Sequence, residues 1–160
     1  MSLISAKAHL AQFGADTRVV ELAQSSATVE LAAQALGCEP RRIAKSIALT
    51  VDTQPIVIVV AGDAKLDNAK YKHTFKKKAK MLSADDTLAV TTHPVGGVCP
   101  FGLPETVTVY LDESLKRFPT VFPACGSRNS AIEVSVDELE TFTHHPAWVD
   151  VCKEWQETAA

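Results

Sequence analysis

Residues 43–61 read IAKSIALTVDTQPIVIVVA and predict the centre of the fold. Two β-rich runs, 46–51 and 56–61, flank the turn-forming residues 52–55, a pattern typical of a β-hairpin or a close strand pair. The second run, IVIVVA, is apolar throughout, so we expect a central strand covered on both faces. Pro40 favours a short helical turn that leads to Lys45, which would then stand where this turn becomes a strand.

Helices and strands are predicted on both sides of this hairpin from capping residues and apolar spacing. Thr28 can cap a helix that Gly37 ends, and Ser135 and Glu138 have the spacing of a capping box. The predicted helices cover residues 5–13, 29–36, 67–82, 84–88 and 136–142, and the further strands cover 18–22, 106–111, 120–122, 132–135 and 148–152. Because these elements mix without a βαβ rhythm, we expect an α/β fold and no doubly wound nucleotide-binding sheet.

Length and composition indicate one ordinary globular domain. A chain of 160 residues with 46% hydrophobic and 22% charged residues fits a single compact domain over residues 1–160, with a mixed, mostly antiparallel sheet and surrounding helices. No apolar run reaches the roughly 18 residues that span a bilayer, and the N-terminus does not resemble a signal peptide. We therefore expect a cytoplasmic protein that does not associate with membranes.

The four cysteines, at positions 38, 99, 125 and 152, form no C-x-x-C pair. Free thiols in a reducing compartment are the expectation, and no zinc site or cofactor is predicted.

Basic residues are concentrated in one segment of an otherwise acidic chain. The net charge is −3, yet seven of the sixteen lysines and arginines fall within residues 65–80. Two interpretations stay open: a solvated helix face, or a surface for an RNA backbone, whose affinity would fall steeply with salt. The lysines that lie away from the apolar stripe of this predicted helix are Lys70, Lys72, Lys76, Lys77 and Lys80.

A loop rich in glycine and proline, HPVGGVCPFG at residues 93–102, is the first candidate for chemistry. Gly96 and Gly97 allow a ligand to approach the backbone closely, and Pro100 stiffens the loop. Such a loop can present N–H donors to an oxyanion or a phosphate, or it can be a structural turn. It matches neither a P-loop nor a dinucleotide-binding motif.

Lys45 and Cys99 are the other reactive candidates. Lys45 has apolar neighbours, so it is either a surface residue or a cation that points into a cleft and holds an anionic or carbonyl group. Cys99 lies in the glycine–proline loop, but a catalytic thiol needs a base and an activating environment. His93 is the nearest histidine in sequence, and we interpret Cys99 as a passive thiol.

Three segments together resemble one family. IAKS at residues 43–46, AGDAKLDN at 61–68 and GGVCPFG at 96–102 follow one another with the spacing of the YbaK/ProX family of aminoacyl-tRNA editing domains, and the chain is most similar to its EbsC-like members. ACGS at 124–127 and IEV at 132–134 also fit. The resemblance covers nearly the whole chain.

The resemblance implies a trans-acting enzyme of translation quality control that hydrolyses the ester of mischarged aminoacyl-tRNA without a metal or cofactor. It implies that Lys45 is the principal functional residue and that Gly96 and Gly97 supply backbone groups around the ester. The implied partners are tRNA and, as an option, an aminoacyl-tRNA synthetase. The residues implied to bind the substrate are Ser46, Gly62, Asp63, Val98, Cys99, Pro100, Gly126 and Ser127.

One position departs from the family pattern. Ala131 stands where several members carry an aspartate, which leaves the edited amino acid open. Two alternative functions also stay open: a non-catalytic module that binds an aminoacyl group or a nucleotide, and a hydrolase of small acyl esters. The sequence does not decide the oligomeric state.

Overall fold

The hairpin at residues 43–61 forms the centre of the computed structural model, which describes residues 2–155. Strands β2 (Ile43–Val51) and β3 (Gln54–Ala61) pair antiparallel along eight residues, from Ala44 opposite Ala61 to Val51 opposite Gln54. Residues 56–61 of β3 are each at most 2% exposed. The predicted central strand, covered on both faces, is therefore confirmed.

The main sheet is mixed and has six strands in the order β8-β6-β2-β3-β5-β9. β2 pairs antiparallel with β3, and β6 with β8, while the other three pairings of this sheet are parallel. Two short antiparallel ribbons, β1–β7 and β4–β10, bring the antiparallel pairings within residues 2–155 to four of seven. The remaining strands are β1 (Val20–Glu21), β4 (Lys65–Leu66), β5 (Thr108–Asp112), β6 (Thr120–Pro123), β7 (Ser130–Ala131), β8 (Val134–Ser135), β9 (Ala147–Val149) and β10 (Cys152–Lys153).

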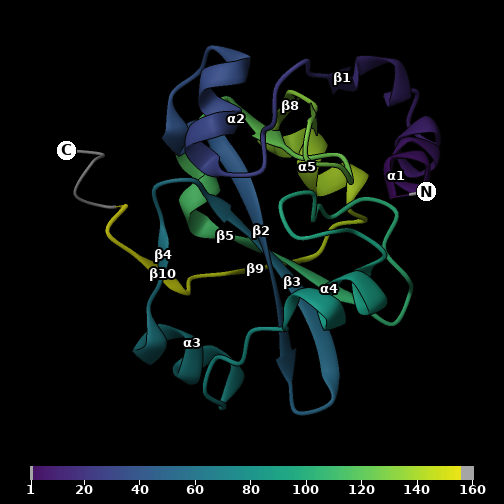
Figure 1. The fold of residues 1–160 in the computed structure, drawn as a ribbon. Helices are drawn as coiled ribbons and strands as arrows, with labels where there is room; N and C mark the ends of the chain where they lie inside the picture. The colour runs from purple at the N-terminus through teal and green to yellow at the C-terminus, as the bar shows by residue number, and fades with distance from the viewer. Residues whose placement is uncertain (1, 156–160) are drawn as a thin grey trace.

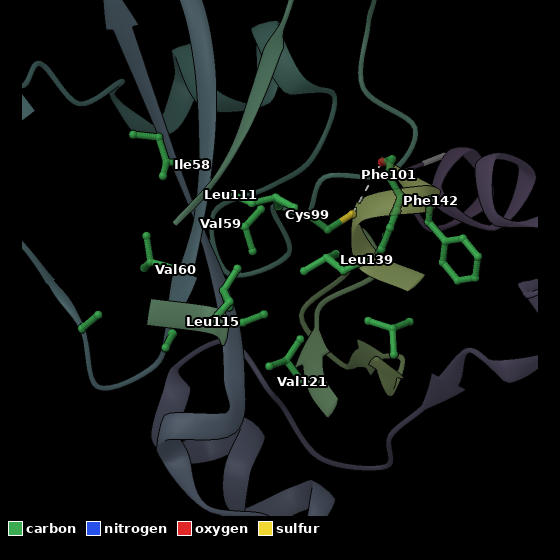
Figure 2. Packing of buried hydrophobic residues seen from close by; sticks show 14 of the residues in the cluster. Ile58, Val59, Val60, Cys99, Phe101, Leu111, Leu115, Val121, Leu139 and Phe142 are labelled. Carbon is green, nitrogen blue, oxygen red and sulfur yellow. Dashed lines mark hydrogen bonds between the residues drawn. The ribbon is translucent and has the colours of Figure 1, made fainter. Parts of the chain in front are cut away.

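Different elements cover the two faces of the sheet (Figure 1). On one face, Phe75 of α3 packs edge-on against Tyr110, which lies beside Ile58 in the strand register. On the other face, Val57 belongs to a cluster that Val90 of α4 and Val98 of the glycine–proline loop join. The larger core around Val59, Leu111, Leu115, Val121 and Leu139 is fully buried and contains Cys99 and Phe101 (Figure 2).

Local capping signals predicted the helix ends well where they were present. Thr28 caps α2 by accepting a hydrogen bond from the Leu31 N–H at 3.1 Å, and Gly37 ends this helix with φ +68°. Ser135 and Glu138 form the predicted capping box of α5. The helices are α1 (Ser2–Ala11), α2 (Val29–Leu36), α3 (Asn68–Phe75), α4 (Ala84–Thr91) and α5 (Val136–Phe142), with 3-10 turns η1 (Asp16–Arg18), η2 (Pro40–Arg42) and η3 (Glu113–Arg117).

The prediction of one helix over residues 67–82 is wrong. α3 ends at Phe75, and Lys76 takes a left-handed conformation with φ +63°. The chain then returns to β2, where the Thr50 N–H donates to the Lys80 oxygen at 2.9 Å and the Leu82 N–H donates to the Ala48 oxygen at 3.1 Å. Tertiary pairing with the edge of β2 therefore overrides the helical spacing of these residues.

The other boundaries shift by a few residues. α1 begins and ends earlier than predicted and α4 is longer. The expected strand 132–135 is shortened to β8, and the expected strand 148–152 is divided into β9 and β10. Within residues 2–155, no helix has both the length and the apolar character to cross a membrane.

Candidate functional site

A cavity of about 340 Å³ opens along the free edge of β2. β6 pairs with β2 only at Ile43 and Ala44, and the returning chain meets β2 again at Leu49, opposite Met81. Within residues 2–155, no strand therefore pairs with residues 45–47 of β2 on this side. The cavity lies at this gap, between β6 and the segment around Met81. It is lined by residues 26–29, Ala32, residues 43–48, Met81, Leu82, Thr87, Val95, Gly96, Val98, Phe122, Ala124, Ser130 and Ala131.

The backbone of Ser46 faces this gap. Along a strand that pairs antiparallel, the N–H and C=O of every second residue point to the same side. Since the Ala48 oxygen and the Thr50 N–H point away from β3, the N–H and C=O of Ser46 do so as well. The Ser46 hydroxyl is buried and has no partner within residues 2–155. The Ser46 N–H and C=O are thus available to a ligand, whereas the hydroxyl is enclosed by the protein.

Lys45 lies in β2 itself, because the strand begins at Ile43 and not at residue 46 as predicted. It lines the cavity and is half-buried, and its ammonium has no hydrogen bond or ion pair with another described residue. Burial lowers the pKa of this ammonium, while the nearby carboxylates of Asp63 and Glu30 oppose the effect. The site therefore holds a partly desolvated cation that can bind an anionic or carbonyl oxygen.

Gly96 and Val98 bring the glycine–proline loop to the same cavity. Gly96 has φ +90°, a conformation that favours glycine. The Gly97 N–H donates to the Pro94 oxygen at 2.9 Å, so this amide already has an acceptor. Among the described residues, the N–H groups of Gly96 and Val98 have no acceptor, so these amides, and not that of Gly97, can donate to a ligand.

The rings of two histidines form hydrogen bonds with the backbone of the glycine–proline loop. The ring of His93, which is fully buried, contacts the Phe101 oxygen through Nε2 at 2.7 Å and Ser2 through Nδ1. The Gly102 N–H donates to Nδ1 of His9 at 3.1 Å. Burial lowers the pKa of His93 and of His9, so both rings are neutral at neutral pH. Their hydrogen bonds to Phe101 and Gly102 hold the loop in place.

Cys99 and Pro100 are buried and do not line the cavity. The Cys99 sulfur points into the core, 3.5 Å from the Phe101 oxygen and 3.5 Å from Nε2 of His93 (Figure 2). Burial raises the pKa of this thiol to about 12. A thiol with such a pKa is not a nucleophile at neutral pH, in agreement with its interpretation as passive.

The other residues implied by the resemblance also lie outside the lining. Gly62 packs against Pro40, and the Asp63 carboxylate binds the guanidinium of Arg117 at 2.5 and 2.9 Å. A Cβ at Gly97 would lie 2.9 Å from the backbone of Ser127, and one at Gly126 would meet Ser2. These residues take part in packing and an ion pair outside the lining.

The basic residues form two sets. Lys70 binds Asp150 at 3.1 Å, and Lys77 binds Asp52 at 3.3 Å. Lys72, Lys76 and Lys80 are exposed, and Lys80 directly precedes Met81 at the cavity. The lysines beyond Phe75 thus lie on an irregular segment that leads to the cavity, and not on a helix face.

Sequence reasoning missed the hydroxyl groups of the lining. Ser26, Thr28, Thr87 and Ser130 come from separate parts of the chain and meet only after folding. Thr28 was predicted as a helix cap, and nothing in the local pattern indicated a further place in a cavity. Ala131, noted as a departure from the family pattern, is also a lining residue.

Comparison with known proteins assigns the family. The profile of the aminoacyl-tRNA editing domain matches residues 23–142, which include β2 and the glycine–proline loop. The chain belongs to this family. Three quarters of its length lies within the match, so the editing domain accounts for most of the protein.

The chain is also similar to individual proteins and to a solved structure. The chain is 54% identical over 157 residues to YwhH of Bacillus subtilis (strain 168), an uncharacterised protein whose full length is covered. It is 26% identical over 118 residues to a proline–tRNA ligase of Geobacillus sp. (strain WCH70), of which it spans 20%. A solved structure proposed to be a trans-editing enzyme for prolyl tRNA synthetase superposes with a TM-score of 0.85 at 27% identity, over 95% of this chain and 97% of that one.

Proposed function

We propose that this protein hydrolyses, in trans, the ester that joins a wrongly attached amino acid to tRNA. The observation that carries the proposal is that one cavity is lined by Lys45 and by Gly96 and Val98, whose N–H groups have no acceptor within residues 2–155. The family and the likeness to a proposed trans-editing enzyme support it. The assignment to the EbsC-like branch, a single editing domain over residues 1–160 and a cytoplasmic location are parts of the same proposal.

The chemistry requires a water molecule to attack the ester carbonyl carbon. A C–O bond forms to the water oxygen, the bond to the ribose oxygen breaks, and that oxygen takes a proton. The N–H groups of Gly96 and Val98 would stabilise the developing oxyanion, and losing one such donor typically lowers the rate about 10²–10³-fold. Lys45 would orient a phosphate or the carbonyl region by a charge-assisted hydrogen bond.

Within residues 2–155, the lining contains no histidine, cysteine, aspartate or glutamate. The proton that water loses would therefore pass to another water molecule, to the substrate, such as a hydroxyl of the terminal ribose, or to Lys45 in its neutral form. The same composition leaves no customary metal ligand in the lining, so we propose metal-independent hydrolysis. The exposed lysines beyond Phe75 would contact the tRNA backbone, and a prolyl-tRNA synthetase is the partner that the relatives favour.

The test offers the purified protein a panel of mischarged tRNAs, especially alanyl, cysteinyl and seryl forms. We expect at least one ester to be hydrolysed faster than in buffer, and Lys45→Ala to abolish most of this difference. Lys153→Ala is the matched control, because Lys153 is an exposed lysine of β10 that does not line the cavity. No hydrolysis above buffer, or equal turnover by Lys45→Ala, would reject the proposal.

A second function is favoured because, within residues 2–155, the lining contains no carboxylate or histidine that could serve as a general base. A cavity with a cation and hydrogen-bond donors, but no carboxylate or imidazole to act as a base, could bind an aminoacyl group without cleaving it. Binding of a non-hydrolysable aminoacyl-adenosine analogue by the wild type, with no turnover of any ester in the panel, would identify such a binding module.

A further inference from the structure

The charges around the cavity are unusual for a site that receives an amino acid. An aminoacyl ester carries a free α-amino group, which is an ammonium when protonated. Among the residues that the structure describes, Lys45 is the charged side chain of the lining, and no carboxylate belongs to it. A second cation would therefore have to approach Lys45 in a partly desolvated space, where repulsion is stronger than in water.

The charged groups on the surrounding elements do not remove this repulsion. Glu30 is exposed on the first turn of α2 and lies outside the lining. Asp63 is engaged by Arg117. Lys80 precedes Met81 at the cavity, and Arg128 donates to the Val95 oxygen beside Gly96, so these elements add positive charge. The thiol of Cys152 and the ammonium of Lys65 are the other titratable groups near Lys45.

Without a carboxylate, the acceptors that remain for an α-amino or α-hydroxyl group of the substrate are uncharged oxygens. The Ser46 carbonyl faces the gap in β2 and can accept a hydrogen bond there, whereas the Ser46 hydroxyl is buried away from the cavity space. The Ser26 and Ser130 hydroxyls are bonded to neighbours, to the Arg128 oxygen and to Ser127 respectively. A carbonyl or hydroxyl oxygen accepts a hydrogen bond from an amine or from an alcohol alike.

We propose that the cavity takes the acyl group with its α-amino group neutral, and that it therefore also takes α-hydroxyacyl esters. This inference rests on the proposed hydrolase function and adds a substrate class to it. The reaction is the same ester hydrolysis, in which water becomes part of the released hydroxy acid and the ribose oxygen takes the proton.

The experiment compares two esters on one tRNA: an aminoacyl ester that the protein hydrolyses, and its α-hydroxy counterpart made by nitrous acid deamination. Rates above buffer are measured at about pH 6 and pH 8, and the amino-to-hydroxy ratio is taken at each pH. Both esters meet the same enzyme groups, so the titration of Lys45 cancels in the ratio. If the amine titrates near ~7.7, as chain-terminal amines do, the ratio should rise about 30-fold.

A charge variant gives an independent readout. Ala131→Asp places a carboxylate in the lining, so it should raise the ratio at pH 6 and flatten its dependence on pH. The wild-type comparison decides the question alone if this variant does not fold.

The results separate a failure of the neutral-amine inference from a failure of the proposed hydrolase function. If the aminoacyl ester is hydrolysed but the α-hydroxyacyl ester is not, or if the wild-type ratio is constant or falls with pH, the neutral-amine inference is wrong and the hydrolase proposal stands. If neither ester is hydrolysed above buffer, both are overturned.

Discussion

Single glycines in this protein are required for two different reasons, space and backbone conformation. A Cβ at Gly62 would lie 2.1 Å from the Pro40 oxygen, so there is no room for a side chain where the end of β3 passes η2. Gly14 has open space around its Cα but a φ of +69°. Glycine at position 62 is thus required by packing between distant segments, and glycine at position 14 is required by the local backbone conformation.

Gly62→Ala should therefore be more damaging than Gly14→Ala. Relieving the contact at Gly62 needs a shift of backbone, and we expect a loss of about 3 kcal/mol or more in the free energy of unfolding. Gly14→Ala should cost about 1–2 kcal/mol from its left-handed conformation alone. Urea denaturation of both variants measures the difference, and equal losses would show that space at Gly62 is not limiting.

At the scale of elements, the segment after α3 connects a basic surface with the cavity. Lys76 ends the helix, and residues 80–82 pair with the edge of β2 next to the cavity. A polyanion bound along this segment would be directed toward Met81 and the cavity rim. This arrangement joins the proposed tRNA contact to the proposed site of hydrolysis.

Replacing Lys76 and Lys77 together by glutamine should weaken tRNA binding and make it less dependent on salt. Each phosphate contact that is lost should reduce the slope of log K against log salt by about 1. Filter binding at several salt concentrations measures this. Lys7→Gln is the control, because α1 lies on the opposite side of the molecule from α3 (Figure 1). An unchanged slope would restore the interpretation of a solvated surface.

How far the sequence predicts an element depends on where its partners lie. The hairpin, the caps of α2 and the capping box of α5 are specified by neighbours within a few residues, and all three were predicted. The end of α3 depends on a strand edge some thirty residues earlier, and the periodicity of residues 67–82 does not contain it. Likewise, the apolar neighbours of Lys45 made it a candidate and a resemblance gave it the principal role, whereas the engagement of the Gly97 amide by Pro94 is a property of the folded loop.

For the whole molecule, Asp112 ties the C-terminal segment to the sheet. This residue is fully buried at the end of β5, and its two oxygens accept from the N–H groups of Ser114 and Val151, both at 2.9 Å. Val151 in turn accepts from the Asp67 N–H at the start of α3. One carboxylate thus links η3, the C-terminal segment and, through Val151, the element that precedes the lysines.

Asp112→Ala should lower the stability of the whole domain. It leaves two buried N–H groups without an acceptor, and each such loss costs about 1–3 kcal/mol, so we expect about 2–5 kcal/mol in total. Asp112→Asn keeps one acceptor oxygen and should lose less. Urea denaturation of the three proteins gives the order, and an alanine variant as stable as the wild type would contradict this role.

The gap in β2 also bears on how the protein behaves at high concentration. An unpaired strand edge is a template on which another chain can add a strand and begin to aggregate. Here the edge is open over only three residues, with β6 on one side and the Met81 segment on the other. The short opening admits a small ligand but cannot support an extended intermolecular ladder, so the arrangement that leaves hydrogen-bonding groups free for a substrate also limits self-association.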